Sequence, residues 1–357
     1  MKNLEKYLTL LDGEVDGLLL TSRYSRHYGA EYDIAEGVAV VSKAGCRYFT
    51  DNRYTEAAMN GIQGFEVLDV AKGGGYVKCI NKCIEDFGIT TLGFEENYLT
   101  VAEFMLYEKN VNAKLVPFTK EINGFRATKE DWELDVMRKA QAITDKAFAE
   151  VCPRIKAGMT ELELQAELIY CLYKNGATGL AFDPIVVSGP NSSLPHGVAC
   201  ERVIQDGDFV TMDFGALYNG YCADMTRTVV IGKADEEIKR LYNTVLRAQT
   251  TAIESLKVGL PCAEADKIAR DIIDNAGYKG LFGHSLGHGV GLYIHEAPRF
   301  AASVPADVLL APGHVVTVEP GIYIEGKYGC RIEDMIAVLE DGTIYDFTKS
   351  PKELIEL

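Results

Sequence analysis

The sequence predicts two domains, an α/β domain over residues 1–124 and an α+β domain over residues 125–357. Three observations carry this prediction. The chain has 357 residues, more than one ordinary hydrophobic core accommodates. Up to about residue 120, short apolar runs alternate with helical patterns, as in a layered α/β domain. Beyond Asn123-Gly124 the pattern changes to long helices, hairpins and a segment rich in glycine and histidine.

The first domain is expected to be built from short strands and helices in alternation. The apolar runs that predict strands are residues 15–20, 38–41, 47–50, 65–70 and 92–94. The segments that predict helices are residues 4–11, 51–60 and 76–87. Few side chains in this domain suggest chemistry, so we look for function in the second domain.

The second domain begins with a helical pattern. Thr128, with Asp131 three positions later, resembles a helix N-cap, and apolar residues at helical spacing follow. A second helix is predicted to start within residues 158–163. Two further helices are predicted over residues 235–256 and 263–276.

Composition restricts the class of protein. A hydrophobic content of 47% with 25% charged residues is typical of a soluble globular protein. The net charge of −16 argues against nucleic acid or an anionic membrane surface as a partner and leaves neutral or cationic small substrates open. The N-terminal segment lacks the pattern of a signal peptide, and no apolar run is long enough for a membrane span. We therefore expect a cytoplasmic protein whose nine cysteines, none in a CxxC pair, are reduced.

The stretch MDFGALYNGYCADMTR predicts a hairpin that carries two acids. A two-residue turn at Asn219-Gly220 places Asp213 diagonally from Asp224, whereas a four-residue loop over residues 217–220 places them directly opposite. Both registers put the two carboxylates on one face. At roughly 5 Å and an effective dielectric constant near 20, they repel by about 3 kcal/mol, so a proton, a basic group or a metal ion should compensate.

A second hairpin, centred near Gly326, would bring two further acids together. Glu319 ends one apolar run and Glu333 enters the next, and each interrupts a strand where an unpaired carboxylate is costly. Four of the six histidines fall in Gly-rich sequence that allows close approach of the backbone to a substrate or metal. These histidines are His196, His284, His288 and His295.

These four carboxylates and one imidazole form a candidate ligand set for two divalent ions: Asp213, Asp224, Glu319, Glu333 and His288. Four negative charges would balance four positive ones, and the metals would make a shared water easy to ionise. Oxygen-rich ligation favours Mn²⁺, Mg²⁺ or Co²⁺ over Zn²⁺. Other motifs fail: Arg299 interrupts the HExxH pattern that begins at His295, and no dinucleotide fingerprint, Walker lysine or GxSxG elbow occurs.

With these residues, the chain resembles the pita-bread metallopeptidases, in the branch of Xaa-Pro dipeptidase (prolidase) and aminopeptidase P. The resemblance covers residues 126–345 and rests on LPHG, DFGALYNGYCADMTRT, HSLGHGVG, HEAP and EPGIYI followed by RIED. FTDNRYTEAA resembles the N-terminal domain that this branch shares with creatinase. The implied fold is an α/β N-terminal domain followed by an α+β pita-bread catalytic domain, and a homodimer is implied as well.

The resemblance also implies roles. Asp213 would bind one metal and His288 with Glu319 the other, while Asp224 and Glu333 bridge both. Water would attack the carbonyl carbon of the bond before proline, and Glu319 would also transfer the proton of that water. The resemblance further implies that His196 and His295 stabilise the tetrahedral oxyanion, and that His284 and Arg331 bind the proline and any carboxylate on it. Mn²⁺ is the expected metal, Co²⁺ the next and Zn²⁺ the least suited; His27 and His314 match no motif.

Several readings remain open at this point. Dipeptidase and aminopeptidase P are not separated by one sequence, nor is the residue preferred before proline. Arg331 counts against methionine aminopeptidase, and the intact ligand positions count against creatinase. A noncatalytic pita-bread binding protein is the alternative from another class, but such proteins typically lose ligands or gain basic insertions.

Overall fold

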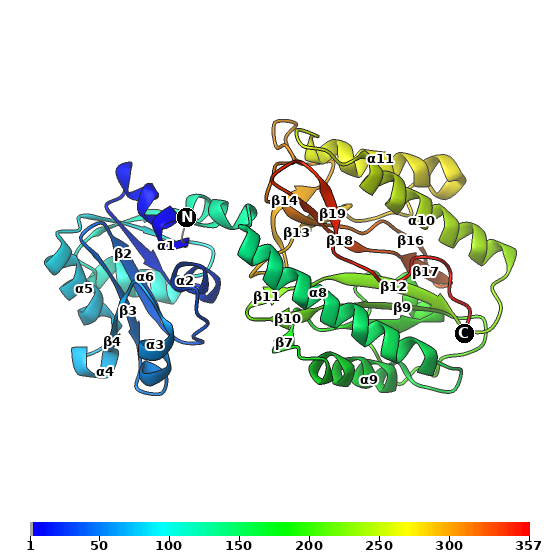
Figure 1. Cartoon of the computed structure of the whole chain (residues 1–357), viewed down its shortest axis with the longest axis horizontal. Helices are drawn as coiled ribbons and strands as arrows, with labels where there is room; N and C mark the ends of the chain where they lie inside the picture. Colours follow the sequence, from blue (N-terminus) through cyan, green and yellow to red (C-terminus); the bar gives the residue numbers. More distant parts are fainter. Residues whose placement is uncertain (1–2) are drawn as a thin grey trace. The chain divides into compact units, whose positions relative to one another are not determined.

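The computed structural model describes residues 3–357 and divides into two compact units, the first ending at Arg126 and the second spanning Ala127–Leu357 (Figure 1). Mixed α/β structure in the first unit and α+β structure in the second confirm the predicted fold class. Between residues 3 and 357, no helix combines the length and the apolar character needed to cross a bilayer. All nine cysteines are free thiols.

The first unit is built on a six-stranded sheet of order β4-β3-β2-β1-β5-β6, in which β2 pairs antiparallel with β1 and with β3 and the other pairs are parallel. The strands are β1 (Gly17–Leu20), β2 (Val38–Ser42), β3 (Gly45–Thr50), β4 (Glu66–Asp69), β5 (Thr91–Phe94) and β6 (Lys114–Pro117). The helices are α1 (Asn3–Thr9), α2 (Arg23–Ala30), α3 (Thr55–Gly61), α4 (Val70–Gly73), α5 (Tyr76–Phe87), α6 (Val101–Asn110) and α7 (Thr119–Gly124). Each predicted strand is present, while β6, α2, α4, α6 and α7 were not predicted.

The second unit contains two successive halves, each a pair of helices followed by antiparallel strands. The first half has α8 (Asp131–Val151), α9 (Glu161–Lys174), β7 (Gly179–Leu180), β8 (Ile185–Ser188), β9 (Phe209–Phe214), β10 (Ala216–Tyr218), β11 (Tyr221–Cys222) and β12 (Met225–Val230). The second half has α10 (Glu236–Ser255), α11 (Cys262–Ile273), β13 (Gly287–Gly289), β14 (Glu296–Phe300), β15 (Val315–Val318), β16 (Gly321–Ile324), β17 (Tyr328–Arg331), β18 (Asp334–Val338) and β19 (Ile344–Asp346). In Figure 1 the strands of this unit run between α9 on one side and α10 and α11 on the other.

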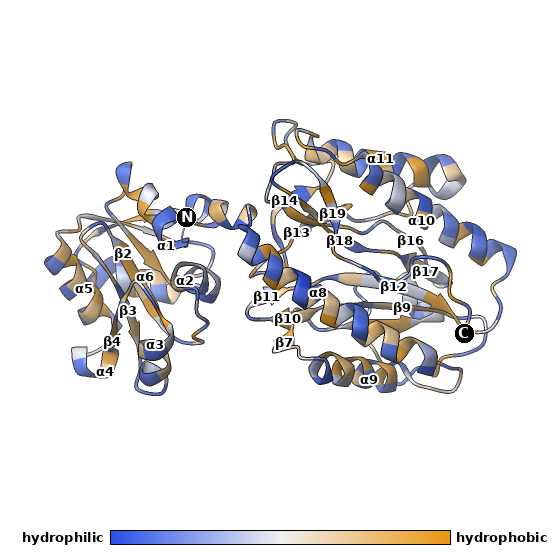
Figure 2. Ribbon diagram, in the orientation of Figure 1, coloured by the Kyte–Doolittle hydropathy of each residue, from blue (hydrophilic) through white to orange (hydrophobic). Residues whose placement is uncertain are grey.

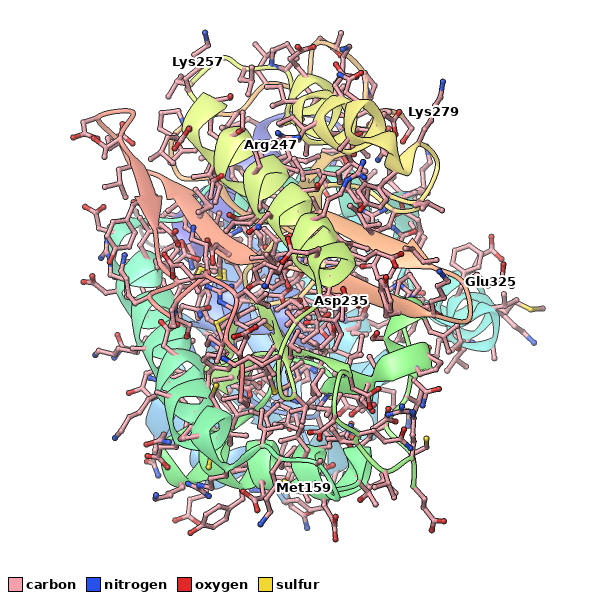
Figure 3. All side chains as sticks on the ribbon, turned by 90° about the vertical axis from the view of Figure 1, so that its right-hand side faces the viewer. Met159, Asp235, Arg247, Lys257, Lys279 and Glu325 are labelled. Carbon is pink, nitrogen blue, oxygen red and sulfur yellow. The ribbon has the colours of Figure 1, made fainter. Side chains whose placement is uncertain are left out.

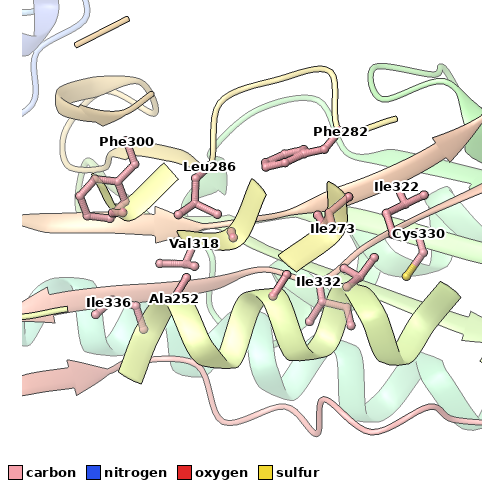
Figure 4. Packing of buried hydrophobic residues seen from close by; sticks show 14 of the residues in the cluster. Ala252, Ile273, Phe282, Leu286, Phe300, Val318, Ile322, Cys330, Ile332 and Ile336 are labelled. Atoms are coloured by element: carbon pink, nitrogen blue, oxygen red, sulfur yellow. The ribbon is translucent and has the colours of Figure 1, made fainter. Parts of the chain in front are cut away.

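The strands of the second unit form four small sheets, with orders β11-β10-β7, β12-β9-β8, β14-β13-β15-β18-β19 and β16-β17. The helices turn their apolar faces to these strands and their polar faces outward (Figure 2). In one core, Ala252 of α10 packs with residues such as Val318, Ile332 and Ile336 (Figure 4). Charged side chains such as Lys257 and Lys279 project away from the ribbon (Figure 3). Burial of apolar surface on both sides therefore holds the strands that carry the predicted site.

The predicted start of α8 was wrong. The helix begins at Asp131, and its cap is Glu130, which forms a capping box with Glu133. Thr128 instead pairs with His314 in an isolated antiparallel bridge. A strand-like contact, which sequence spacing does not reveal, therefore removes Thr128 from the helix N-terminus.

Candidate active site and metal centre

The first acidic hairpin has the two-residue turn. Leu217 pairs with Cys222, and Asn219 and Gly220 adopt φ values of 48° and 84°, as a type I′ turn requires. The same register continues where Asp213 pairs with Thr226. Asp224 lies two residues before Thr226 and so shares the face of Asp213, as both predicted registers required; the four-residue loop is excluded.

The second hairpin turns at Gly326, as predicted. Gly321 pairs with Arg331, and Val318 pairs with Asp334. This shared register sets Glu319 opposite Glu333 at the gap between the two ladders. Both acids therefore sit where regular strand pairing is interrupted, and their side chains are free to leave the sheet.

The two hairpins and the Gly-rich segment converge on a cavity of about 340 Å³. Its wall includes every residue predicted for the site, from both halves of the second unit. These residues are His196, Asp213, Asp224, His284, His288, His295, Glu319, Arg331 and Glu333. By contrast, His314 is held in its bridge with Thr128 and His27 belongs to the first unit, and neither lines the cavity.

Potential ligand atoms lie close together in this cavity. His288 Nε2 is 3.6 Å from Asp224 Oδ2 and 3.4 Å from Glu319 Oε1. Asp224, His288 and Glu333 each offer an atom within 4.8 Å of the other two. Glu333 is fixed by β12, because its N–H donates to the Thr226 carbonyl and its Oε2 accepts from the Thr226 hydroxyl at 2.7 Å. One cation could therefore contact ligands that come from three separate segments of the second unit.

The electrostatics of the cluster suit a cation. Burial, reinforced by neighbouring acids, raises the pKa of Asp224 and of Glu333 well above the ordinary carboxyl range. Burial likewise raises the pKa of Glu319 to about 8, and it lowers the pKa of His288 to about 3, which leaves a ring nitrogen free to bind a metal. Asp213 Oδ1 is buried without a hydrogen-bond partner. An oxygen-rich set with an unsatisfied buried acceptor fits divalent ions.

Comparison with known proteins agrees with this geometry. Residues 135–340 match the model of metallopeptidase family M24, and residues 3–128 match that of the creatinase/prolidase N-terminal domain. The chain belongs to metallopeptidase family M24. It is therefore a metallopeptidase, a hydrolase, and membership of the family implies divalent metal ions.

Relatives and solved structures match this M24 peptidase over its full length or nearly so. An uncharacterized peptidase of Bacillus subtilis is 41% identical over 96% of both chains. A structure described as Xaa-Pro dipeptidase from Bacillus anthracis is 43% identical, with a TM-score of 0.94, and the match covers 100% of this chain and 99% of that one. A structure of X-Pro aminopeptidase from Thermotoga maritima is 35% identical, with a TM-score of 0.92, over 100% of both chains.

Arg331 connects several polar groups in the M24 site. Its Nη2 donates to Asp213 Oδ2 at 2.7 Å, its Nη1 to Tyr323 Oη at 2.8 Å and to a backbone carbonyl, and its Nε to Thr226 Oγ1. His284 reaches the same Tyr323 hydroxyl at 2.9 Å through Nε2. Four of the five N–H groups of Arg331 thus donate hydrogen bonds within the protein. These contacts were not predicted from the sequence.

Two glycines of the HSLGHGVG motif have a different role from the predicted one. A Cβ at Gly287 would lie 2.0 Å from the Thr317 carbonyl oxygen, and a Cβ at Gly289 would lie 2.2 Å from that of Ala297. The missing side chains therefore admit neighbouring strands on either side of His288, rather than a substrate or a metal.

Several residues that shape the site were not predicted. Tyr323 joins His284 to Arg331, Thr226 holds Glu333, and Thr317 donates to Glu319 Oε1 at 3.3 Å. Each lies inside or beside a quoted motif, so proximity to a predicted ligand was the only signal for them. The cavity wall also includes Phe182, Ile185, Pro195, Ser285, Ile294 and Arg299.

Proposed function

We propose that this M24 peptidase hydrolyses the bond before proline at the N-terminus of dipeptides or short peptides, with two divalent ions, preferably Mn²⁺. The observation that carries the proposal is the convergence of four acids and His288 in one cavity that also presents His196, His295 and Arg331. A volume of about 340 Å³ is at the small end for ligand pockets and suits a short peptide.

The five ligands would divide between the two ions. Asp213 would bind one ion, His288 and Glu319 the other, and Asp224 and Glu333 both. Four carboxylates would balance the charge of two divalent ions, which would offset the burial and the repulsion that together raise the pKa of Asp224 and Glu333. Oxygen-rich ligation favours Mn²⁺ and then Co²⁺ over Zn²⁺.

Bound divalent ions supply Lewis acidity that ionises water near neutral pH and polarises a carbonyl group. The chain would supply the remaining functions. Glu319 takes the proton of the attacking water and returns it to the leaving nitrogen. His196 and His295 donate hydrogen bonds to the developing oxyanion. His284, held by Tyr323, flanks the proline ring.

The relatives support a preference for proline without separating two specificities. The similar structures include one described as Xaa-Pro dipeptidase and one as X-Pro aminopeptidase. Arg331 could also contact a carboxylate on proline, as a dipeptidase requires, but most of its N–H groups are already engaged. Both specificities therefore stay within the proposal.

The test compares four substrates with Mn²⁺-loaded protein: Ala-Pro, Ala-Pro-Ala, a longer Xaa-Pro peptide and Ala-Ala. We expect cleavage of the Xaa-Pro bond in at least one of the first three and much slower cleavage of Ala-Ala. Release of proline only from Ala-Pro would assign a dipeptidase. Cleavage of the longer peptides would assign an aminopeptidase. Equal cleavage of Ala-Ala would instead indicate a metallopeptidase of other N-terminal specificity and would refute the proline preference.

A further inference from the structure

Arg227 is the largest fully buried side chain of the described residues and contacts the backbone of the candidate metal ligand Glu333. It follows Thr226 on β12 and is not among the residues that line the cavity. Its Nη1 donates to the Glu333 carbonyl oxygen at 2.6 Å and to that of Thr226 at 2.9 Å. It therefore holds the backbone of two residues whose side chains are hydrogen-bonded to each other at 2.7 Å.

The remaining donors of Arg227 hold other parts of the second unit. Nη2 donates to Asp334 Oδ1 at 2.7 Å and to the Ser350 carbonyl at 2.8 Å, and Nε donates to the Pro351 carbonyl at 2.9 Å. All five N–H groups of the guanidinium are thus used, in a planar arrangement that a lysine could not reproduce. The C-terminal segment and the strand after Glu333 are joined through one side chain.

Asp334 completes the network on its other oxygen. Gln249 of α10 donates from Nε2 to Asp334 Oδ2 at 2.7 Å, and Lys352 Nζ pairs with the same oxygen. Asp334 is fully buried, whereas the Lys352 side chain is 26% exposed. Through these two contacts, the buried carboxylate ties α10 and Lys352 to the position next to Glu333.

We propose that Arg227, Asp334 and Lys352 form a positioning network that fixes Glu333 for metal binding, so that the C-terminal segment takes part in building the site. The inference rests on the proposed two-ion function. The link to the site is the direct contact of Arg227 with the main chain of Glu333 and Thr226. Groups that orient a metal ligand typically change metal affinity by about 10- to 100-fold when removed.

Lys352→Met is the first test, because Lys352 is partly exposed and does not line the cavity. We expect its Mn²⁺ dissociation constant, measured by calorimetry, to rise about tenfold, at the lower end of the range for such groups. The visible absorption of the Co²⁺-loaded protein should shift as well, because that spectrum reports ligand geometry and not global stability. Lys233→Met is the matched control, since Lys233 pairs with Glu356 in the same C-terminal segment at an exposed position. The control should keep the wild-type affinity and spectrum.

The outcomes separate this inference from the proposed function. Wild-type affinity and spectrum in Lys352→Met would overturn the positioning role and leave the two-ion proposal intact. A wild-type chain that binds no divalent ion would overturn both. If Lys352→Met does not fold, Gln249→Met removes the other, neutral partner of Asp334 Oδ2 with little change of volume, and the same shifts are expected.

Discussion

Arg331 Nη2 donates to Asp213 Oδ2 at 2.7 Å, and both side chains are largely hidden from solvent. The two residues are 118 positions apart in the sequence and join the two hairpins of the site. Their pairing supplies one positive charge to a cavity that holds four carboxylates. We therefore expect the stability of the metal-free protein to depend on this guanidinium.

Replacement of Arg331 by Gln should destabilise the metal-free protein at pH 8. Removal of one partner of a buried ion pair typically costs about 3–5 kcal/mol, because the other charge stays buried and unpaired. Urea unfolding in the presence of EDTA measures the change in the free energy of unfolding. Arg23→Gln is the control, since its pair with Asp33 is exposed and should contribute at most about 1 kcal/mol. Equal effects of the two substitutions would contradict the importance of the Arg331 pair.

The stability of the metal-free protein should fall as pH rises from about 4.5 to 8. Burial raises the pKa of Glu319 from 4.5 to about 8, so the native state binds more protons than the unfolded state across that window. The stabilising protonation is complete below the unfolded pKa and is lost as pH rises through the folded pKa. Asp224 and Glu333 are shifted in the same direction.

The contribution of Glu319 is isolated by Glu319→Gln, which is neutral at every pH. We expect the free energy of unfolding of the wild type, measured relative to this variant in EDTA, to decline between pH 5 and pH 8. Saturating Mn²⁺ should remove the decline of the wild type, because cations replace the protons. A difference that stays constant with pH would argue against a raised pKa for Glu319.

Ligand substitutions should change the number of bound ions in a defined way. Asp213→Asn should retain one Mn²⁺ per chain, because Asp213 is assigned to a single ion. Asp224→Asn should retain none, because Asp224 is assigned to both. Metal analysis after desalting measures the ratio, and Asp206→Asn, at an exposed turn, should retain two. Two ions in Asp224→Asn would show that the assignment of the ligands is wrong.

Substitution of His295 by Ala should lower kcat with little effect on Mn²⁺ affinity. Its ring lies 4.4 Å from that of His288, centroid to centroid, so it borders the ligand set without belonging to it. Loss of one oxyanion donor typically lowers kcat by about 10²- to 10³-fold. Steady-state kinetics and Mn²⁺ titration separate the two effects. His314→Gln, outside the cavity, should leave kcat unchanged, and a similar loss there would point to a general structural cause.

Side-chain parity accounts for what the sequence predicted well. Alternation along a strand has a fixed period of two, so the spacing of Asp213 and Asp224, and that of Glu319 and Glu333, is enough to assign each pair to a shared face. The histidines and Arg331, which line the same cavity, were predicted from Gly-rich sequence and from the resemblance of the five quoted motifs. Only the pairing of the acids depends on local rules that hold in every sheet.

Contacts between distant segments account for what was missed. Because Thr128 pairs with His314, α8 starts later than predicted. At Gly287 a neighbouring strand lies too close for a side chain, so this glycine serves packing. The hydrogen-bond partners of the Arg331 side chain come from four separate segments. No periodicity encodes such contacts, because they depend on how the two halves of the second unit pack.

The candidate ligands are divided between those two halves: Asp213 and Asp224 precede α10, and His288, Glu319 and Glu333 follow α11. Bound ions would therefore act as a noncovalent cross-link between the two halves of the second unit. The hydrogen bond from the Glu333 amide to the Thr226 carbonyl also joins these halves. Its hydrogen exchange should slow sharply when Mn²⁺ is added, whereas amides in the six-stranded sheet of the first unit should exchange at unchanged rates.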